Sequence, residues 1–483
     1  MNPRRPLSEI VARRDLAADP TITGVTADSR KVAPGVLFAA LPGTKADGRD
    51  FIPAAIAAGA AAILAPEDTP DQAVPVVRAL DVRRAYALAA ARFWEAQPPT
   101  VVAVTGTNGK TSVATFCRQI FGTLGRKAAS LGTLGLQVGD EAVTPPGLTT
   151  PDAADVARFA ALLAERGVTH LALEASSIGI DQRRLDGLAL VAAGFTNLSQ
   201  DHLDYHPGMD AYAAAKLRLF EELLPRGAAA VLNADSDAFP AFAAAAVTHG
   251  QTVLSVGEAG QGLRLVSRTP TPEGQRLVVE HLGETVEVAL PLAGAFQAAN
   301  ALVAAGLCIA AGEEPRAVLK ALERLRGAPG RLQRVGTGHR GGEAYVDYAH
   351  TPDGLATVLQ ALRPHVRGRL IVVFGAGGDR DRAKRPLMGR AAAEFADLVI
   401  VTDDNPRTED PAAIRRAILE AAPSALEVAD RRAAIRAGVE QLRSGDVLVV
   451  AGKGHEQGQI VGTETYPFDD VAETAKALES VHA

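Results

Sequence analysis

The stretch Val101-Val-Ala-Val-Thr-Gly-Thr-Asn-Gly-Lys-Thr-Ser112 decides the fold, because an apolar strand runs directly into a glycine turn, a lysine and two hydroxyl side chains. Apolar residues at helical spacing then indicate a helix whose buried face carries Val113, Phe116, Cys117, Ile120, Phe121 and Leu124. The turn therefore opens a helix N-terminus, where free backbone N–H groups and the helix dipole favour a polyphosphate.

Each residue type in this turn has a part in phosphate binding. Gly106 and Gly109 let the backbone approach the phosphates, Lys110 supplies a positive charge, and the Thr111 hydroxyl can coordinate Mg²⁺. The spacing departs from the standard Walker pattern, because Val104 stands where that pattern has glycine. We predict that ATP is bound by Gly106, Thr107, Asn108, Gly109, Lys110, Thr111 and Ser112.

Length and composition describe a protein of several domains. A chain of 483 residues is too long for one core and suggests about three domains. The net charge of −6 argues against a nucleic-acid binder, and two cysteines argue against a disulfide framework. The N-terminus lacks the apolar core of a signal peptide, and no apolar run is long enough to span a bilayer. We therefore expect a cytoplasmic protein.

Two turn-rich segments divide the chain. The Pro-rich connector Glu95–Thr100 precedes the ATP-loop strand, and Leu325–Arg331 follows a helical pattern that begins near Pro315. The predicted domains are residues 1–98, residues 99–328, which contain the ATP loop, and residues 329–483.

The order of strands and helices predicts an α/β fold in which a small N-terminal α/β domain, a central P-loop ATPase-like domain with a mainly parallel sheet and a C-terminal Rossmann-like domain follow one another. In the central domain, 168–173 and 188–195 are predicted strands. In the last domain, the strands 370–374, 398–401 and 447–450 run into the loops 375–380, 403–407 and 452–456. Because ligands bind beyond the carboxyl ends of such strands, these loops should form one site.

The middle domain carries three further candidate groups. Glu174 ends an apolar strand, where a carboxylate suits Mg²⁺, although it could instead cap the next turn. His202 lies in a segment rich in metal-competent side chains. Lys216 shares a helical face with Tyr212 and Leu219, so its amine either reaches the edge of that face or is made anionic by carbamylation and becomes an oxygen ligand for Mg²⁺.

Taken together, Thr105–Thr111, Glu174, His202 and Tyr212-Ala-Ala-Ala-Lys216 resemble the Mur ligases over nearly the whole chain. The resemblance implies an enzyme of peptidoglycan biosynthesis, and hence of cell-wall biogenesis, cell shape, cell division and the cell cycle. Asp28-Ser-Arg30, Asp404–Arg407 and Gly452–Glu456 favour the reaction that joins meso-2,6-diaminopimelate to UDP-N-acetylmuramoyl-L-alanyl-D-glutamate, with ATP as co-substrate and Mg²⁺ as cofactor. The implied partners are these small molecules, and the chain is expected to act as a monomer.

The resemblance implies that residues 1–98 bind the UDP end of the substrate, residues 99–328 bind ATP and residues 329–483 bind the amino acid. It also implies roles for individual residues. Lys110, Glu174, His202 and Lys216 would be catalytic, and the metal would be held by Thr111, Glu174, His202 and carbamylated Lys216. Further residues near the nucleotide would be Asn300, Arg331, Asp347 and His350. The UDP substrate would be bound by Ser29, Thr44, Lys45, Ala46, Thr149, Thr150, Ser176, Gln182 and Arg184. Diaminopimelate would be bound by Arg380, Asp404, Asn405, Pro406, Arg407, Gly452 and Glu456.

Two departures and several alternatives remain open at this point. Ile178 stands where relatives commonly carry histidine, and Gln297 where they commonly carry asparagine, so substrate-side details rather than the reaction class are in doubt. Asn405-Pro-Arg407 could be an exposed turn instead of an amino-acid pocket. The competing functions are the same ligase acting on L-lysine or L-ornithine, a folylpolyglutamate synthase-like ligase, and a nucleotide-switch NTPase.

Overall fold

The computed structural model describes residues 3–16, 18–43, 46–271 and 273–480. The chain forms two compact units, one made of Met1–Arg264 with Leu302–Val318 and the other of Leu265–Ala301 with Leu319–Ala483. In the described ranges, no helix is both long and apolar enough to cross a membrane.

The N-terminal part of the first unit is a small parallel sheet covered on both faces. Its four strands follow one another in chain order, β3 (Gly24–Thr26), β4 (Val36–Ala39), β5 (Ala62–Pro66) and β6 (Val76–Ala79). Alternate side chains pack against α1 (Leu7–Val11) and α3 (Val82–Trp94) on one face and α2 (Ile52–Ala57) on the other. Burial of both faces explains why the inner strands β4 and β5 are continuous apolar runs.

The central sheet of the first unit has a parallel core. Its strand order is β8 (Ala128–Gly132), β11 (His170–Glu174), β7 (Thr100–Thr105), β12 (Ala192–Phe195), β13 (Ala229–Asn233) and β14 (Thr252–Gly257). The antiparallel β9 (Gly135–Val138) and β10 (Glu141–Ala142) extend the β8 edge. Because β7 lies between β11 and β12, the loops after these three strands meet at one edge of the sheet.

Helices cover both faces of this sheet. One face carries α5 (Ala153–Glu165), α8 (Phe239–Thr248) and the turn Leu219–Leu223 that continues α7 (Met209–Arg218). The other carries residues 302–310 of α9 (Ala295–Ala310), where Val303 and Leu307 lie so close to Gly194 that a side chain there would crowd them. Cys117 of α4 (Lys110–Thr123) and Cys308 of α9 are both buried, and the Cys117 thiol contacts the Ala304 carbonyl.

Two predicted strands of this domain are shorter than expected. The prediction for 188–195 was wrong over its first four residues, because β12 begins only at Ala192. Before it, the Leu188 N–H donates to the Leu185 carbonyl and closes a turn. The prediction for 168–173 begins two residues early, because Val168 N–H still bonds the carbonyl of Leu163 in α5. In both cases apolar residues that close a turn read like the start of a strand.

The second unit ends in a six-stranded sheet. The strand order is β18 (Gln333–Thr337), β19 (Glu343–Asp347), β23 (Val447–Ala451), β20 (Leu370–Phe374), β21 (Leu398–Val401) and β22 (Leu426–Glu427), parallel except for β18. The predicted strands 370–374 and 398–401 are confirmed at both ends, and 447–450 gains one residue. The same unit contains the antiparallel pair β16 (Gly274–His281) and β17 (Glu284–Leu290).

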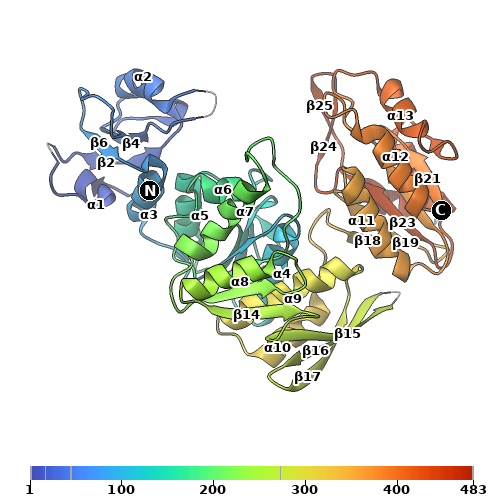
Figure 1. The fold of residues 1–483 in the computed structure, drawn as a ribbon. Helices are drawn as coiled ribbons and strands as arrows, with labels where there is room; N and C mark the ends of the chain where they lie inside the picture. Colours follow the sequence, from blue (N-terminus) through green and yellow to red (C-terminus); the bar gives the residue numbers. More distant parts are fainter. Residues whose placement is uncertain (1–2, 17, 44–45, 272, 481–483) are drawn as a thin grey trace. The chain divides into compact units, whose positions relative to one another are not determined.

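Five helices enclose the C-terminal sheet. One face packs against α11 (Pro352–Leu362), α12 (Lys384–Phe395) and α13 (Pro411–Leu419), which lie together in Figure 1. The other packs against α14 (Arg431–Gln441) and α15 (Asp470–Ser480), where Arg431 and Asp470 form a fully buried bidentate ion pair. A separate hairpin of β24 (Gly458–Val461) and β25 (Glu464–Pro467) completes the domain.

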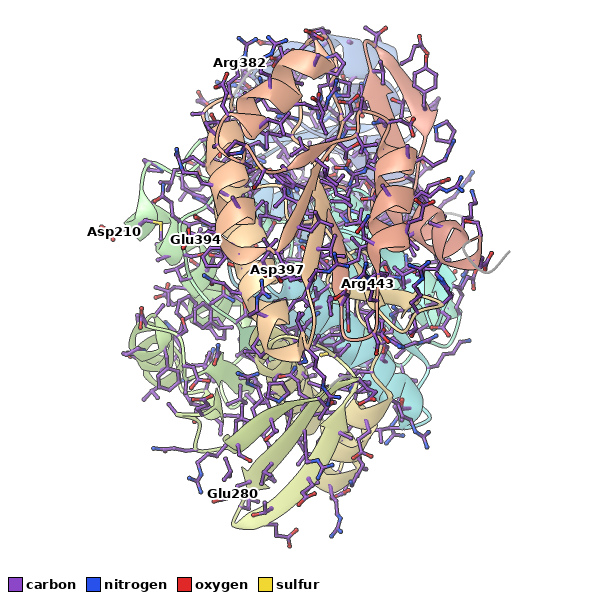
Figure 2. All side chains as sticks on the ribbon, turned by 90° about the vertical axis from the view of Figure 1, so that its right-hand side faces the viewer. Asp210, Glu280, Arg382, Glu394, Asp397 and Arg443 are labelled. Atoms are coloured by element: carbon purple, nitrogen blue, oxygen red, sulfur yellow. The ribbon has the colours of Figure 1, made fainter. Side chains whose placement is uncertain are left out.

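The two ends of this parallel sheet are chemically different. Asp397 and Arg443 lie before β21 and β23 begin, whereas Arg382 lies at the opposite end, past the carboxyl end of β20 (Figure 2). The three loops singled out from the sequence lie at the Arg382 end. The predicted α/β fold class is thus confirmed, including the mainly parallel central sheet and the Rossmann-like C-terminal sheet.

Candidate active site

The turn between β7 and α4 has the backbone of a phosphate-binding loop. Gly106 adopts φ of +148° and Gly109 +89°, both of which favour glycine. A Cβ at Gly106 would lie 1.9 Å from the hydroxyl of Thr196, so no other residue fits. Asn197 fixes Asn108 of the same turn, because the side-chain oxygen of Asn197 accepts the Asn108 N–H at 3.0 Å. Helix α4 begins at Lys110, directly after this fixed turn.

Two lysine amines converge on one carbonyl of this loop. Lys110 Nζ donates to the Gly106 and Thr107 carbonyls at 2.8 Å each, and Lys216 Nζ donates to the same Gly106 carbonyl at 2.8 Å. Lys216 is 1% exposed. Burial lowers the pKa of Lys216 to about 6, and the nearby Lys110 charge adds to that effect. At neutral pH the Lys216 amine is therefore largely uncharged.

Glu174 ends β11 beneath the loop and is held from several sides. Thr111 of α4 donates its hydroxyl to Glu174 Oε2 at 2.9 Å, while Thr133 donates its backbone N–H to Oε1 at 2.8 Å and its hydroxyl to Oε2 at 3.2 Å. A Cβ at Gly132 would lie 2.0 Å from Glu174 Oε1, so glycine makes room for the carboxylate. Hydroxyl and carboxylate oxygens are hard ligands of the kind Mg²⁺ prefers.

Tyr212 links the remaining predicted metal residues. The centroid of its buried ring lies 4.3 Å from Lys216 Nζ and 6.3 Å from the centroid of the His202 ring. The His202 side chain is 42% exposed, and the backbone of this residue adopts φ of +52°. Among the described residues, no group of three or more His, Cys, Asp or Glu side chains is placed to hold a metal ion. A metal site here would depend on the threonine hydroxyl and on modified Lys216.

Four of the predicted substrate residues form one hydrogen-bonded network. Thr150 donates its hydroxyl to the Glu174 carbonyl at 2.8 Å and lies 3.0 Å from the Ser176 hydroxyl, which caps α6 (Ser177–Asp181). Arg184 bonds the Thr150 carbonyl at 2.6 Å and the side-chain oxygen of Gln182 at 2.7 Å. Thr149 approaches from the side of Thr133, with their hydroxyls 3.1 Å apart. Ile178 of α6 is half-buried.

Of the predicted UDP-substrate residues, Ser29 and Ala46 line a large cavity of the first unit. Ser29, Arg30 and Ala46 line it together with Asp152 and Arg158, and its volume is about 1520 Å³. Asp28 accepts both N–H groups of the Arg30 guanidinium fork, which lowers the pKa of its carboxyl to about 2. Thr44 and Lys45 lie outside the described residues.

In the second unit, the predicted nucleotide residues form two small groups. Asn300 donates to the side-chain oxygen of Gln297 at 3.3 Å, and Gln297 donates to the Arg331 carbonyl at 3.2 Å. The departure at Gln297 therefore has a structural use, because its longer side chain joins α9 to the segment before β18. The Arg331 guanidinium stacks 4.7 Å above the ring of Tyr348.

Asp347 and His350 differ in their surroundings. Asp347 at the end of β19 accepts the Leu332 N–H at 2.6 Å and the Ala349 N–H at 2.8 Å. Burial raises the pKa of this carboxyl, and Arg331 opposes the effect. His350 is exposed, and its Nδ1 bonds the Tyr348 carbonyl. Asp347 thus shapes the strand end, while His350 has a side chain free to face solvent.

The three C-terminal loops meet as the sequence predicted. Gly378 N–H donates to the Asn405 carbonyl at 2.9 Å, and the Asn405 side chain donates to Glu456 Oε2 at 3.1 Å. A Cβ at Gly452 would lie 2.5 Å from Asp404 Oδ2, so glycine lets the carboxylate approach. These contacts bring the loops after β20, β21 and β23 together.

Arg407 and Arg380, the two predicted arginines of these loops, have different environments. Arg407 follows Pro406, adopts φ of +52° and donates from Nη1 to the Gly378 carbonyl at 2.8 Å, and the residue as a whole is half-buried. Arg380 is exposed in the neighbouring loop. Asn405-Pro-Arg407 is therefore not a fully exposed turn, because Asn405 is 5% exposed and bonded to the facing loop.

Some site residues were missed from the sequence. Thr133 and Thr196 support the carboxylate and the glycine loop, and Lys453 lies buried where the three C-terminal loops meet, with Nζ 2.7 Å from Asn405 Oδ1. Thr133 and Thr196 carry no sequence signal, since threonine is common at strand ends. Lys453 did have one, because a lysine between two glycines directly after a buried strand is unusual for a solvated residue.

A glycine turn between a buried parallel strand and a helix that begins with lysine defines a P-loop-type α/β protein. Three family models match the chain: the catalytic domain of the Mur ligase family at residues 21–94, the Mur ligase middle domain at 104–308, and the Mur ligase glutamate ligase domain at 330–454. The chain belongs to the Mur ligase family and is an enzyme of the amide ligase type.

Individual relatives cover the whole chain. A UDP-N-acetylmuramoyl-L-alanyl-D-glutamate–2,6-diaminopimelate ligase from Caulobacter vibrioides is 72% identical over 97% of this chain and 98% of its own length. The protein of the same name from Bradyrhizobium diazoefficiens is 54% identical over 96% and 98%. A solved structure with that ligase name is similar with a TM-score of 0.77 and 34% identity, and covers 100% of both chains.

Proposed function

We propose that this enzyme uses ATP to join meso-2,6-diaminopimelate to UDP-N-acetylmuramoyl-L-alanyl-D-glutamate in the cytoplasmic synthesis of peptidoglycan precursors. The observation that carries the reaction type is the convergence of Lys110 and Lys216 on the Gly106 carbonyl, above Glu174. The names and coverage of the relatives support the choice of substrates. We retain the domain roles 1–98, 99–328 and 329–483 and a monomeric state as parts of this proposal.

The chemistry requires management of negative charge. The D-glutamyl γ-carboxylate attacks the γ-phosphate of ATP, ADP leaves, and the amine of the amino acid then displaces phosphate from the acyl phosphate. Lys110 at the start of α4 offsets the repulsion between carboxylate and polyphosphate, and the N–H groups of the first helical turn donate hydrogen bonds to the phosphate oxygens. A metal ion bound here would further stabilise the charge that moves during phosphoryl transfer.

The donor set fits Mg²⁺ at two places. Thr111 and Glu174 supply a hydroxyl and a carboxylate 2.9 Å apart. Lys216 fits a second place as a carbamate, because a neutral amine is the form that adds CO₂, and burial with a pKa of about 6 keeps it neutral. His202 would complete that place from the neighbouring loop. Carbamylation would also replace a costly buried ammonium with an oxygen ligand.

The amino acid would bind at the three C-terminal loops. Diaminopimelate carries a distal carboxylate that L-lysine lacks, and the free part of the Arg407 fork can hold a carboxylate with two parallel hydrogen bonds. Asp404 and Glu456 supply negative charge for an ammonium group on the other side of the pocket. Glycine at 452 keeps the approach open.

Phosphate release tests the reaction directly. With UDP-N-acetylmuramoyl-L-alanyl-D-glutamate and ATP, we expect turnover with meso-diaminopimelate and little with L-lysine, L-ornithine or no amine. A preference for lysine or ornithine would keep the ligase and contradict the Arg407 assignment. Release that needs no acceptor would instead favour the nucleotide-switch alternative. Turnover with a folate substrate would favour the folylpolyglutamate alternative, against which the N-terminal cavity at Ser29 already argues.

Arg407 should control the choice of amino acid. Replacing Arg407 with alanine removes the partner of the distal carboxylate, so kcat/KM for diaminopimelate is expected to fall by about 10²-fold while that for lysine changes little. Steady-state kinetics with both amines measure the ratio. Arg390, which lies exposed on α12, provides the matched control as Arg390→Ala. Equal losses for the two amines would show that Arg407 does not read the distal carboxylate.

A further inference from the structure

The β24–β25 hairpin is an unusual element for a domain of this size. It forms its own two-stranded sheet, and Figure 1 shows it apart from the six-stranded sheet. All four residues of β25 are exposed, and Val461 and Tyr466 expose large apolar side chains. The hairpin therefore adds little to the hydrophobic core, and its place in the fold needs another explanation.

Strand β24 is bonded along the loop that carries Arg407. Gln459 donates its side-chain amide to the Asp404 carbonyl at 2.7 Å, and Ile460 donates its N–H to the Asn405 side-chain oxygen at 3.0 Å. Arg407 N–H then donates to the Ile460 carbonyl at 3.1 Å, and Gly462 N–H donates to the Arg407 carbonyl at 2.7 Å. The hairpin thus supports the loop residue by residue.

Lys453 also forms a hydrogen bond to this loop. It is 0% exposed, and its Nζ donates to the side-chain oxygen of Asn405 and to the carbonyl of Gly458, both at 2.7 Å. Asp404 and Glu456 carboxylates lie 3.9 Å from the amine. The Asn405 oxygen thus accepts from Lys453 and Ile460 while its amide donates to Glu456. The side chain of Asn405 is therefore committed to holding the pocket together.

The backbone of Arg407 explains why such support is needed. Its φ of +52° lies in the left-handed region, which is unfavourable for a residue with a side chain. The two backbone bonds, to Ile460 of β24 and from Gly462 in the hairpin turn, hold this conformation, and the conformation sets the direction in which the guanidinium leaves the chain. A loop released from β24 would relax toward negative φ and turn the guanidinium away.

We propose that the β24–β25 hairpin and the buried Lys453 form a support that sets the selectivity of the amino-acid pocket, with Lys453 and Gln459 as positioning residues. They contact no substrate themselves. They act through Asn405 and Arg407, and favour an amino acid with a distal carboxylate. This inference rests on the proposed function, since it assigns the same pocket to amino-acid binding.

Two substitutions test the support in the full-length enzyme. Lys453→Met and Gln459→Leu keep volume but remove the side-chain hydrogen bonds. Each is expected to raise KM for diaminopimelate about 10-fold and to lower the preference for diaminopimelate over lysine, with KM for ATP unchanged and kcat within about threefold. Glu464→Ala on exposed β25 is the matched control and should match the parent in every constant.

Hydrogen exchange supplies a readout that does not depend on turnover. The backbone amides of 404–408 are expected to exchange faster in Lys453→Met and Gln459→Leu, with no change across 106–112. Unchanged exchange together with an unchanged KM for diaminopimelate would overturn the proposal, even if one variant folds poorly and the other carries the test. A parent enzyme that shows no amine-dependent turnover would overturn the proposed function separately, while exchange at 404–408 still decides whether the hairpin holds the loop.

Discussion

Replacing Lys110 with alanine is expected to lower kcat/KM by about 10³-fold, because this ammonium is the charge nearest the phosphate-binding turn. The loss should appear with saturating amine and UDP substrate, since the defect lies in phosphoryl transfer. Without nucleotide the variant should melt close to the parent, because the Gly106 and Thr107 carbonyls that Lys110 now bonds lie at the site, where water can replace the amine. Phosphate release and thermal unfolding measure the two effects.

Lys127 provides the control for this experiment. It lies outside the phosphate-binding turn, bonds the Arg166 carbonyl, and is exposed. Lys127→Ala should keep parental kinetics. A Lys110→Ala enzyme with more than about one tenth of parental kcat/KM would remove Lys110 from the reaction and leave it a structural role in closing the turn.

Replacing Lys216 should also abolish most activity. Unlike Lys110→Ala, which should melt close to the parent, Lys216→Met is expected to raise the melting temperature. Lys216→Ala removes the amine that would carry the proposed carbamate, so kcat is expected to fall by about 10³-fold and to recover partly when a short-chain carboxylic acid fills the space. Lys216→Met keeps the volume without the amine. Both variants should retain the fold, because the lysine is bonded to one carbonyl and is otherwise packed against Tyr212.

The pH dependence of stability follows from the lowered pKa of Lys216. Between pH 6 and 10.5 the unfolded chain binds a proton that the folded chain does not, so the parent loses stability as pH falls through this range. Lys216→Met has no such proton. Its melting temperature should exceed that of the parent in buffer free of bicarbonate and metal, by more at pH 6 than at pH 9. An active Lys216→Ala enzyme, or no rescue by carboxylic acids, would contradict the carbamate.

Much of the fold was accessible from local sequence patterns. Strands such as Leu370–Phe374 are buried on both faces and bounded by charged or glycine-rich loops, so their ends are marked by composition. The start of β12 was not, because Leu188–Val191 are apolar for a different reason: they pack as a turn beside the sheet. Apolarity alone does not distinguish these two forms of burial.

The candidate site likewise contains residues that could be predicted from the sequence and residues that could not. Gly106, Lys110 and Glu174 could be predicted because their chemistry and their position at strand ends agree. The support of Glu174 by Thr133, and of Asn405 by Lys453, depends on which loops meet in space, and no spacing in the sequence encodes it. The family resemblance supplied reactive residues, whereas the geometry supplied the residues that hold them.

The buried cysteines have a practical consequence. Cys117 and Cys308 are both 0% exposed, and burial raises the pKa of the Cys308 thiol, so neither presents a thiolate to a reagent in solution. A single new cysteine at an exposed position, such as Val247 on α8 or Tyr466 on β25, can therefore be labelled selectively in the native enzyme. The chain is ready for fluorescence or spin-label distance measurements without first removing its own thiols.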